Sequence, residues 1–105
     1  MRVLGIETSC DETAVALFSP ERGLAGEWIS SQVATHARHG GVVPDLAARE
    51  HLRNFAPLLR QAQTEVGFAA VTRVAVTHGP GLAPCLALGV AAAQALGRAL
   101  HVPVV

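Results

Sequence analysis

Short apolar runs alternate with polar stretches over the first third of the chain. The apolar segments "RVLGI" (2–6) and "TAVALF" (13–18) flank one polar stretch. A second turn, "SPERG" (19–23), leads into "LAGEWISSQV" (24–33). Apolar runs of this length bounded by turn residues are typical of β-strands. Three such strands in succession predict an antiparallel meander.

The hydrophobic period changes from about two to about 3.6 residues after Pro44. We expect "ATHARHGGVV" (34–43) to be a loop and Pro44 to lie in the first turn of an amphipathic helix. Pro57 lies inside this pattern, where it should kink or split the helix. The predicted apolar stripe consists of Leu52, Phe55, Leu59, Ala62 and Val66.

The second half of the chain predicts an alternation of strands and helices. "RVAVTH" (73–78) indicates a fourth strand, and Pro84 suits the first turn of a second helix. "HVPVV" (101–105) indicates a fifth strand. The stripe of the second helix is predicted as Leu86, Val90, Ala93, Gly97 and Leu100. The order β-β-β-α-β-α-β predicts an α/β fold with a mixed sheet and helices packed on it.

The apolar end of the chain, Val104-Val105, follows what should be a buried strand. We therefore expect residues 1–105 to form a single N-terminal lobe of a longer, two-lobed protein. "MRVLGIE" reaches an acidic residue too early for a signal peptide. The apolar region 82–100 is interrupted by Pro84, Gln94 and Arg98, so a membrane span is not expected.

Composition restricts the classes of function. Eight basic residues balance eight acidic residues. The net charge is therefore zero and lacks the excess of positive charge that is typical of nucleic-acid-binding proteins. Cys10 and Cys85 lie far apart without a CxxC motif, which excludes a disulfide framework and a zinc module. This cysteine usage suits a reducing compartment, and we expect a cytoplasmic protein.

The unbroken polar run "ETSCDET" (7–13) is the first candidate site. It is either a solvated hairpin whose side chains satisfy their own backbone, or a loop that directs N–H groups and hydroxyls at anionic oxygens. Thr8 and Ser9 could donate to phosphate. Asp11 and Glu12 could hold a metal-bound water or act as a base. Composition alone favours the solvated hairpin.

Three segments together resemble the TsaD family of tRNA N6-adenosine threonylcarbamoyltransferases, formerly called glycoproteases or O-sialoglycoprotein endopeptidases. They are "MRVLGIETSCDETAVAL", "SSQVATHARHGGVVPDLAAREHL" and "GPGL", and they occur in order across nearly the whole chain. The resemblance implies a half-domain of the sugar kinase, Hsp70 and actin superfamily, in which two lobes enclose a nucleotide. The sequence departs from the family pattern at Pro84-Cys85, where glycine and a small residue are expected.

The same resemblance implies an activity: transfer of threonylcarbamoyl from threonylcarbamoyl-AMP to N6 of adenosine 37 in tRNAs that read ANN codons. It implies that Asp11 and Glu12 are catalytic and face the cleft, with Glu7, Thr8 and Ser9 on the side of the nucleotide phosphates. It also implies a divalent metal, iron or zinc, whose ligands lie beyond the matched residues. We expect the chain alone to be inactive and to hold no metal.

The segment "THARHGGVVPDLAAREH" supplies four further candidates, because the resemblance places it on the substrate side of the cleft: His36, Asp45, Arg49 and His51. His36 and His39 have the spacing of some metal-ligand pairs, but no further ligand completes a set. Arg49 either pairs with Asp45 on a solvated helix face or contacts tRNA phosphate or a protein partner. His51 is expected to be partly buried and hydrogen-bonded.

The implied partners are a TsaB-like paralogue, other subunits of a tRNA-modification complex, tRNA and threonylcarbamoyl-AMP, with no membrane. The exposed inner face of a lone lobe also predicts self-association. A non-catalytic scaffold of the same fold is the alternative function, although such paralogues lack "GGVVPDLAAREH". The protease implied by the older family name has no support, because the chain has no HExxH motif.

Overall fold

The computed structural model describes all 105 residues. Its elements are β1 (Arg2–Glu7), β2 (Glu12–Ser19), β3 (Gly23–Ser31), α1 (Val33–Ala37), α2 (Pro44–Glu65), β4 (Val71–Val76) and α3 (Ala83–Leu100). The sheet has the order β3-β2-β1-β4. Strand β2 is antiparallel to both β1 and β3, whereas β4 is parallel to β1. The predicted mixed α/β sheet is confirmed.

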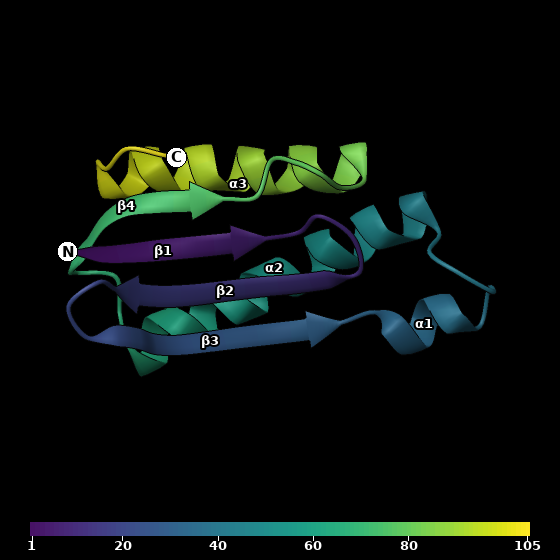
Figure 1. The fold of residues 1–105 in the computed structure, drawn as a ribbon, viewed down its shortest axis with the longest axis horizontal. Helices are drawn as coiled ribbons and strands as arrows, with labels where there is room; N and C mark the ends of the chain where they lie inside the picture. The colour runs from purple at the N-terminus through teal and green to yellow at the C-terminus, as the bar shows by residue number, and fades with distance from the viewer.

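Both long helices lie on one side of the sheet. In Figure 1, α2 passes behind β2 and β3, α3 runs along β4, and no helix covers the face turned to the viewer. Side chains alternate across a strand, so every second residue of β1 and β2 enters the layer between sheet and helices. The core of that layer consists of Leu4, Ile6, Val15, Leu17, Trp28, Leu58, Ala62, Val71, Val74 and Ala93.

Helix α2 begins at Pro44 as predicted and continues through Pro57 without a break, so it is not split. Its predicted stripe is wrong at the N-terminal end, because Leu52 is 67% exposed. His51 is buried in its place. The inward face of α2 is therefore rotated by one residue from the predicted one at this end. The apolar pattern could not predict this, because the hydrogen bonds of His51 to the loop after β1 and to the start of β2 decide which face turns inward.

Helix α3 also begins as predicted, with Pro84 in its first turn, but its buried face starts at Cys85 rather than Leu86. The helix lies very close to its neighbours. A Cβ atom on Gly89 would lie 2.4 Å from Thr8 Oγ1, and one on Gly97 would lie 2.6 Å from Val104 Cγ2. By length and composition alone, α3 is apolar enough to cross a membrane, a test that core helices also pass.

Two predicted segments differ in the structure. Helix α1 begins at Val33 and occupies the first part of the expected loop over 34–43, where His36 is buried and bonded to neighbours on both sides of it. The expected fifth strand is reduced to one parallel bridge between Val74 and Val104. The carbonyl of Pro103 accepts a hydrogen bond from the N–H of Val74 in β4. Proline has no N–H, so it cannot donate a further hydrogen bond to continue the strand pairing.

Candidate functional site

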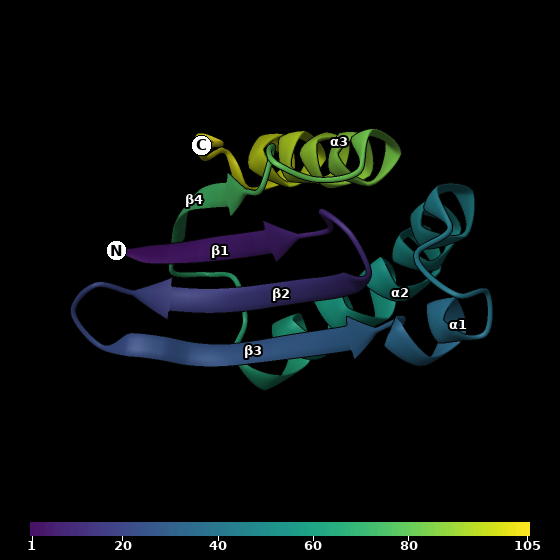
Figure 2. The ribbon, with the colours of Figure 1, turned by 45° about the vertical axis from the view of Figure 1, so that its right-hand side comes forward.

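The candidate site is the loop between β1 and β2. Because β1 and β4 are parallel, this loop and the turn after β4 lie at the same edge of the sheet. The first turns of α2 and α3 and the whole of α1 lie on that side as well (Figure 2). The loop "ETSCDET" thus lies at the edge of the sheet where these segments come together.

Three successive carbonyl groups of the loop each accept a hydrogen bond from a different element. The carbonyl of Ser9 accepts from the backbone N–H that precedes α3, at 2.8 Å. The carbonyl of Cys10 accepts from the ring of His51 in α2, at 2.7 Å. The carbonyl of Asp11 accepts from the backbone N–H of Gln32 after β3, at 2.8 Å. The loop is therefore held from three directions and is not a freely solvated hairpin.

Thr8 is buried, and its hydroxyl donates to the carbonyl of Cys85 at 2.7 Å. The predicted donation from Thr8 to a phosphate is therefore not available in this structure, because the hydroxyl proton is already used. The "GPGL" turn approaches the same loop closely, since a Cβ on Gly81 would lie 2.7 Å from the carbonyl oxygen of Ser9. Glycine at this position permits the contact.

Glu7 links the loop to the turn after β4 by hydrogen bonds. Its carboxylate accepts the backbone N–H of Ser9 at 2.5 Å and the hydroxyl of Thr77 at 2.6 Å. Burial alone would raise the pKa of Glu7, but the hydrogen bonds from Ser9 and Thr77 outweigh it and lower the pKa. The sequence did not single out Thr77, because its position within the predicted strand 73–78 gave no signal of this bond.

Asp11 and Glu12 are the carboxylates that the loop leaves available. Asp11 is half-buried and Glu12 is exposed, and neither side chain makes a hydrogen bond or ion pair within the chain. The hydroxyl of Ser9 is also unbonded. A fixed backbone thus presents two free carboxylates and a hydroxyl, which could accept a proton, orient an amine or donate to an oxyanion. These roles remain predictions.

His51 lies beneath the loop, only 1% exposed. Its Nε2 atom lies 2.7 Å from the Cys10 carbonyl oxygen, and its Nδ1 atom lies 2.7 Å from Thr13 Oγ1. Because a carbonyl only accepts, Nε2 carries the proton and Nδ1 accepts from Thr13. The predicted hydrogen-bonded role is confirmed, although the burial is complete. Both ring nitrogens are used, so His51 supports the loop and does not face a substrate directly.

His36 is 2% exposed and makes a second set of internal bonds. Its Nδ1 atom accepts the N–H of Val43 at 3.1 Å, and its Nε2 atom donates to Gln32 Oε1 at 2.6 Å. Gln32 Nε2 donates in turn to the carbonyl of Ala47 at 3.3 Å. Both ring nitrogens of His36 are thus used within the chain, and its role as a substrate-cleft residue stays a prediction. Gln32, which the sequence did not single out, links this cluster to the backbone of Asp11.

Asp45 and Arg49 are exposed on the first turns of α2 and make no hydrogen bond to the loop. An ion pair between them is one of the alternatives for Arg49, and the structure does not contain it. The ion pair on this helix joins Arg53 to Glu50 at 3.7 Å. The structure therefore brings His51 to the loop but leaves Asp45 and Arg49 on the surface.

A groove of about 490 Å³ opens beside Glu7 on the uncovered face of the sheet. Small residues form its floor, among them Gly5, Ala14, Ala16 and Ala75, and Thr77 lies at its end. No three acidic, histidine or cysteine side chains converge anywhere in the chain. The residues present therefore do not by themselves fit a divalent metal site.

A family model and curated relatives of this chain carry the same description. The family model described as "TsaD: tRNA N6-adenosine threonylcarbamoyltransferase" matches residues 23–105. Two curated relatives with the name tRNA N6-adenosine threonylcarbamoyltransferase align with 99% of the chain. The protein from Nitrosospira multiformis is 51% identical and that from Aromatoleum aromaticum is 49% identical. The chain spans about 30% of the length of these relatives.

Solved structures share the fold. YeaZ from Pseudomonas aeruginosa superposes with a TM-score of 0.71 at 22% identity, over 100% of this chain and 43% of that one. An uncharacterized protein with similarity to peptidase YEAZ from Pseudomonas aeruginosa gives a TM-score of 0.68 at 27% identity, over 99% of this chain and 41% of that one. The sheet and its two helices are thus a known actin-like arrangement.

Proposed function

The chain belongs to the TsaD family of tRNA N6-adenosine threonylcarbamoyltransferases, and from this premise we propose that it forms the N-terminal lobe of such a transferase. The reaction moves threonylcarbamoyl from threonylcarbamoyl-AMP to N6 of adenosine 37 in tRNAs that read ANN codons. The observation that carries the proposal is the loop held from three directions with Asp11 and Glu12 unpaired. Residues elsewhere in the transferase complete the cleft.

The chemistry needs a proton acceptor and a fixed geometry. The adenine N6 attacks the carbamoyl carbon, the bond from that carbon to the AMP phosphate oxygen breaks, and N6 loses one proton. A carboxylate of Asp11 or Glu12 receives that proton or orients the amine. Because hydrogen bonds already fix the loop, these carboxylates need little reorganisation when substrate arrives. The proposal gives the unbonded hydroxyl of Ser9 the role of donor to a phosphate oxygen.

The family resemblance implies iron or zinc in the cleft. The donor set of this chain does not fit such a metal, since no three ligand side chains converge in it. We therefore propose that other parts of the transferase supply the metal ligands. We assign Glu7 a structural role, because the N–H of Ser9 and the hydroxyl of Thr77 donate hydrogen bonds to its two carboxylate oxygens.

We propose the outer surface of α2 and α3 as the face that binds a TsaB-like paralogue. An apolar groove of about 380 Å³ lies between these helices, with Leu52 and Phe55 on one side and Leu88 on the other. Leu52 is 67% exposed, although large apolar side chains are usually covered. In the absence of a partner, we expect this groove to mediate the predicted self-association of the chain.

The catalytic proposal is tested in the complete transferase with Asp11→Asn and Glu12→Gln. We expect at least one variant to lower the rate of threonylcarbamoyl transfer by about 10²-fold or more, as for loss of a general base. The matched control is Glu27→Gln, which removes an exposed carboxylate of β3 that makes no ion pair. Transfer rates unchanged in both site variants would refute the catalytic role and favour the scaffold alternative.

A further inference from the structure

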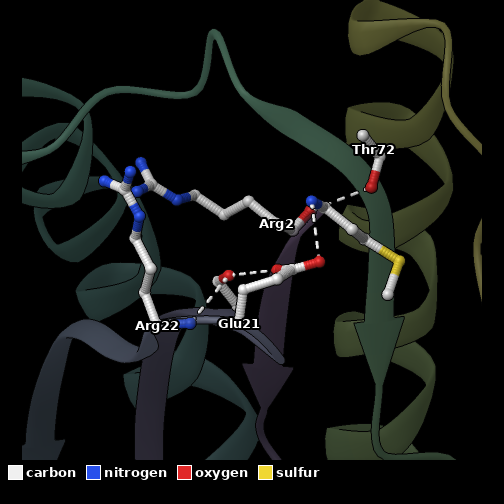
Figure 3. A network of polar contacts seen from close by, with 6 residues as sticks. Arg2, Glu21, Arg22 and Thr72 are labelled. Carbon is white, nitrogen blue, oxygen red and sulfur yellow. Dashed lines mark hydrogen bonds and ion pairs between the residues drawn. The ribbon is translucent and has the colours of Figure 1, made fainter.

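Two arginines meet at the end of the sheet opposite the candidate site. Arg2 is the first residue of β1, and Arg22 lies in the turn between β2 and β3. Their side chains come from different directions, and the two guanidinium groups overlap in the view of Figure 3. Both line one hollow of about 510 Å³, together with Met1, Ser19, Glu21 and Ala70.

The backbone under both arginines is fixed. The carbonyl of Arg2 accepts the hydroxyl of Thr72 at 3.3 Å, across the β1–β4 pairing. The N–H of Arg22 donates to Ser19 Oγ at 3.3 Å, and that hydroxyl donates to Glu21 at 2.6 Å (Figure 3). The two side chains therefore start from positions that the sheet and the turn determine, not from a flexible segment.

The charges of the hollow are not balanced. Neither arginine has a carboxylate within ion-pair distance, since the two ion pairs of the chain are Met1 with Glu21 and Arg53 with Glu50. The carboxylate of Glu21 is engaged by the terminal ammonium of Met1 at 3.5 Å and by the Ser19 hydroxyl. Two guanidinium groups that line one hollow repel each other, and an anion bound in that hollow would offset the repulsion.

The geometry favours a phosphate as this anion. A guanidinium group presents parallel N–H donors that match the oxygens of a phosphate, and two such groups suit its several acceptors. No aromatic side chain lines the hollow, so it offers no platform on which a base could stack. The chemistry therefore suits contact with a phosphate group and not recognition of a nucleobase.

The position of the hollow indicates which molecule carries the phosphate. Strand β1 separates Arg2 from Glu7, and its six residues span roughly 20 Å at about 3.3 Å per residue. A small donor substrate at the candidate site cannot reach that far, whereas a polynucleotide can. We propose that Arg2 and Arg22 form a binding site for backbone phosphates of RNA, at a distance from the reacting groups. This inference rests on the proposed function, because it takes RNA as the substrate.

The test compares two variants of the 105-residue chain that lose the same charge. In the first, Arg2→Gln and Arg22→Gln remove the proposed site. In the matched control, Arg38→Gln and Arg60→Gln remove two exposed arginines that make no ion pair. Fluorescence anisotropy with labelled tRNA measures the binding constant at several salt concentrations, and the fluorescence of Trp28 shows that each variant is folded.

We expect the Arg2/Arg22 variant to bind about tenfold more weakly, and its slope of log K against log salt to fall by about 1 to 2, since each lost phosphate contact removes about one counterion. The control should keep the slope of the unmodified chain. An Arg2→Lys/Arg22→Lys variant should recover most of the slope, because lysine retains the charge.

Equal affinity and slope in the Arg2/Arg22 variant and the unmodified chain would overturn the site while leaving the proposed function intact. Titration with inorganic phosphate provides the second arm. Binding of free phosphate that depends on Arg2 and Arg22, without binding of tRNA, would overturn RNA as the source of the phosphate. The proposed function itself is decided separately, by the transfer assay on Asp11 and Glu12.

Discussion

The ring of His51 bonds to both ends of a four-residue segment: Nε2 lies 2.7 Å from the carbonyl oxygen of Cys10, and Nδ1 lies 2.7 Å from the hydroxyl of Thr13. Asp11 and Glu12 are the two residues between these ends. One buried imidazole on α2 therefore sets the conformation of the backbone that carries both free carboxylates. This arrangement explains why a histidine, and not an aliphatic residue, occupies the inward face of α2 at this position.

Replacement of His51 by phenylalanine should destabilise the chain. The change keeps a ring but leaves the buried Thr13 hydroxyl and the part-buried Cys10 carbonyl without partners. Each unpaired group costs about 1–3 kcal/mol. We expect the free energy of unfolding in urea, followed by Trp28 fluorescence, to fall by about 2–4 kcal/mol. His39→Phe is the control on an exposed residue. A loss no larger for His51 than for His39 would contradict the structural role.

Gly89→Ala tests the close contact between α3 and the loop. The new Cβ would lie 2.4 Å from Thr8 Oγ1, so either the helix or the loop must move. We expect a loss of about 1–3 kcal/mol in the free energy of unfolding, although alanine has the higher helix propensity. Gly5→Ala is the control, because its nearest neighbour would lie at an ordinary 3.9 Å. Stabilisation by Gly89→Ala would show that the contact is not rigid.

Glu7 should make stability depend on acid pH. Its pKa in the folded chain is lowered from the ordinary value of 4.5, so the unfolded chain takes up a proton first as the pH falls. The stabilisation from ionised Glu7 is therefore present above pH 4.5 and is lost as the pH falls below it through the lowered pKa. We expect Glu7→Gln to flatten this part of the curve of unfolding free energy against pH.

Urea unfolding of both proteins at a series of pH values measures this difference. Glu21→Gln serves as a comparison, since hydrogen bonds from Ser19 and from the backbone also lower the pKa of Glu21 at the exposed surface. Its effect should be smaller, because solvent screens an exposed group. Identical slopes for Glu7→Gln and the unmodified chain below pH 4.5 would refute the bonding of Glu7 in the folded state.

The two cysteines should react at different rates. Cys85 is fully buried, and burial first and the nearby Cys10 second raise the pKa of its thiol. Cys10 is half-buried in the loop. With iodoacetamide near pH 8 we expect one label on the folded chain, at Cys10, and a second label only in urea, because the thiolate is the reactive form. Peptide mapping identifies the site, and faster labelling of Cys85 would contradict this packing.

Leu52→Glu tests the proposed partner face. A charge in the apolar groove between α2 and α3 should weaken self-association of the chain, because burial of an unpaired carboxylate is costly. We expect sedimentation at high concentration to show more monomer in the variant. The exposed apolar Ile29 lies on β3 rather than on these helices, so Ile29→Glu is the control. A greater shift for Ile29→Glu would place the association on the sheet instead.

Much of the fold could be predicted from the sequence, and the candidate site only in part. The strands and the two long helices follow from local patterns, and Pro44 and Pro84 mark the first turns of the helices as expected. The importance of "ETSCDET" followed from its composition and the family motif. The bonds of Glu7 and Thr8 did not follow, because their partners Thr77 and Cys85 lie about seventy residues further along the chain.

By itself, the sequence determined the first four strands, the two long helices and the family to which the chain belongs. Periodicity, proline positions and motif residues are local properties, and they act before the chain is folded. Only the tertiary structure decided that His51 rather than Leu52 turns inward, that His36 is buried, and that the carboxylates of Asp11 and Glu12 stay unpaired while that of Glu7 is bonded. These outcomes depend on hydrogen bonds between residues far apart in the chain, such as Thr13 and His51 at a separation of 38 positions.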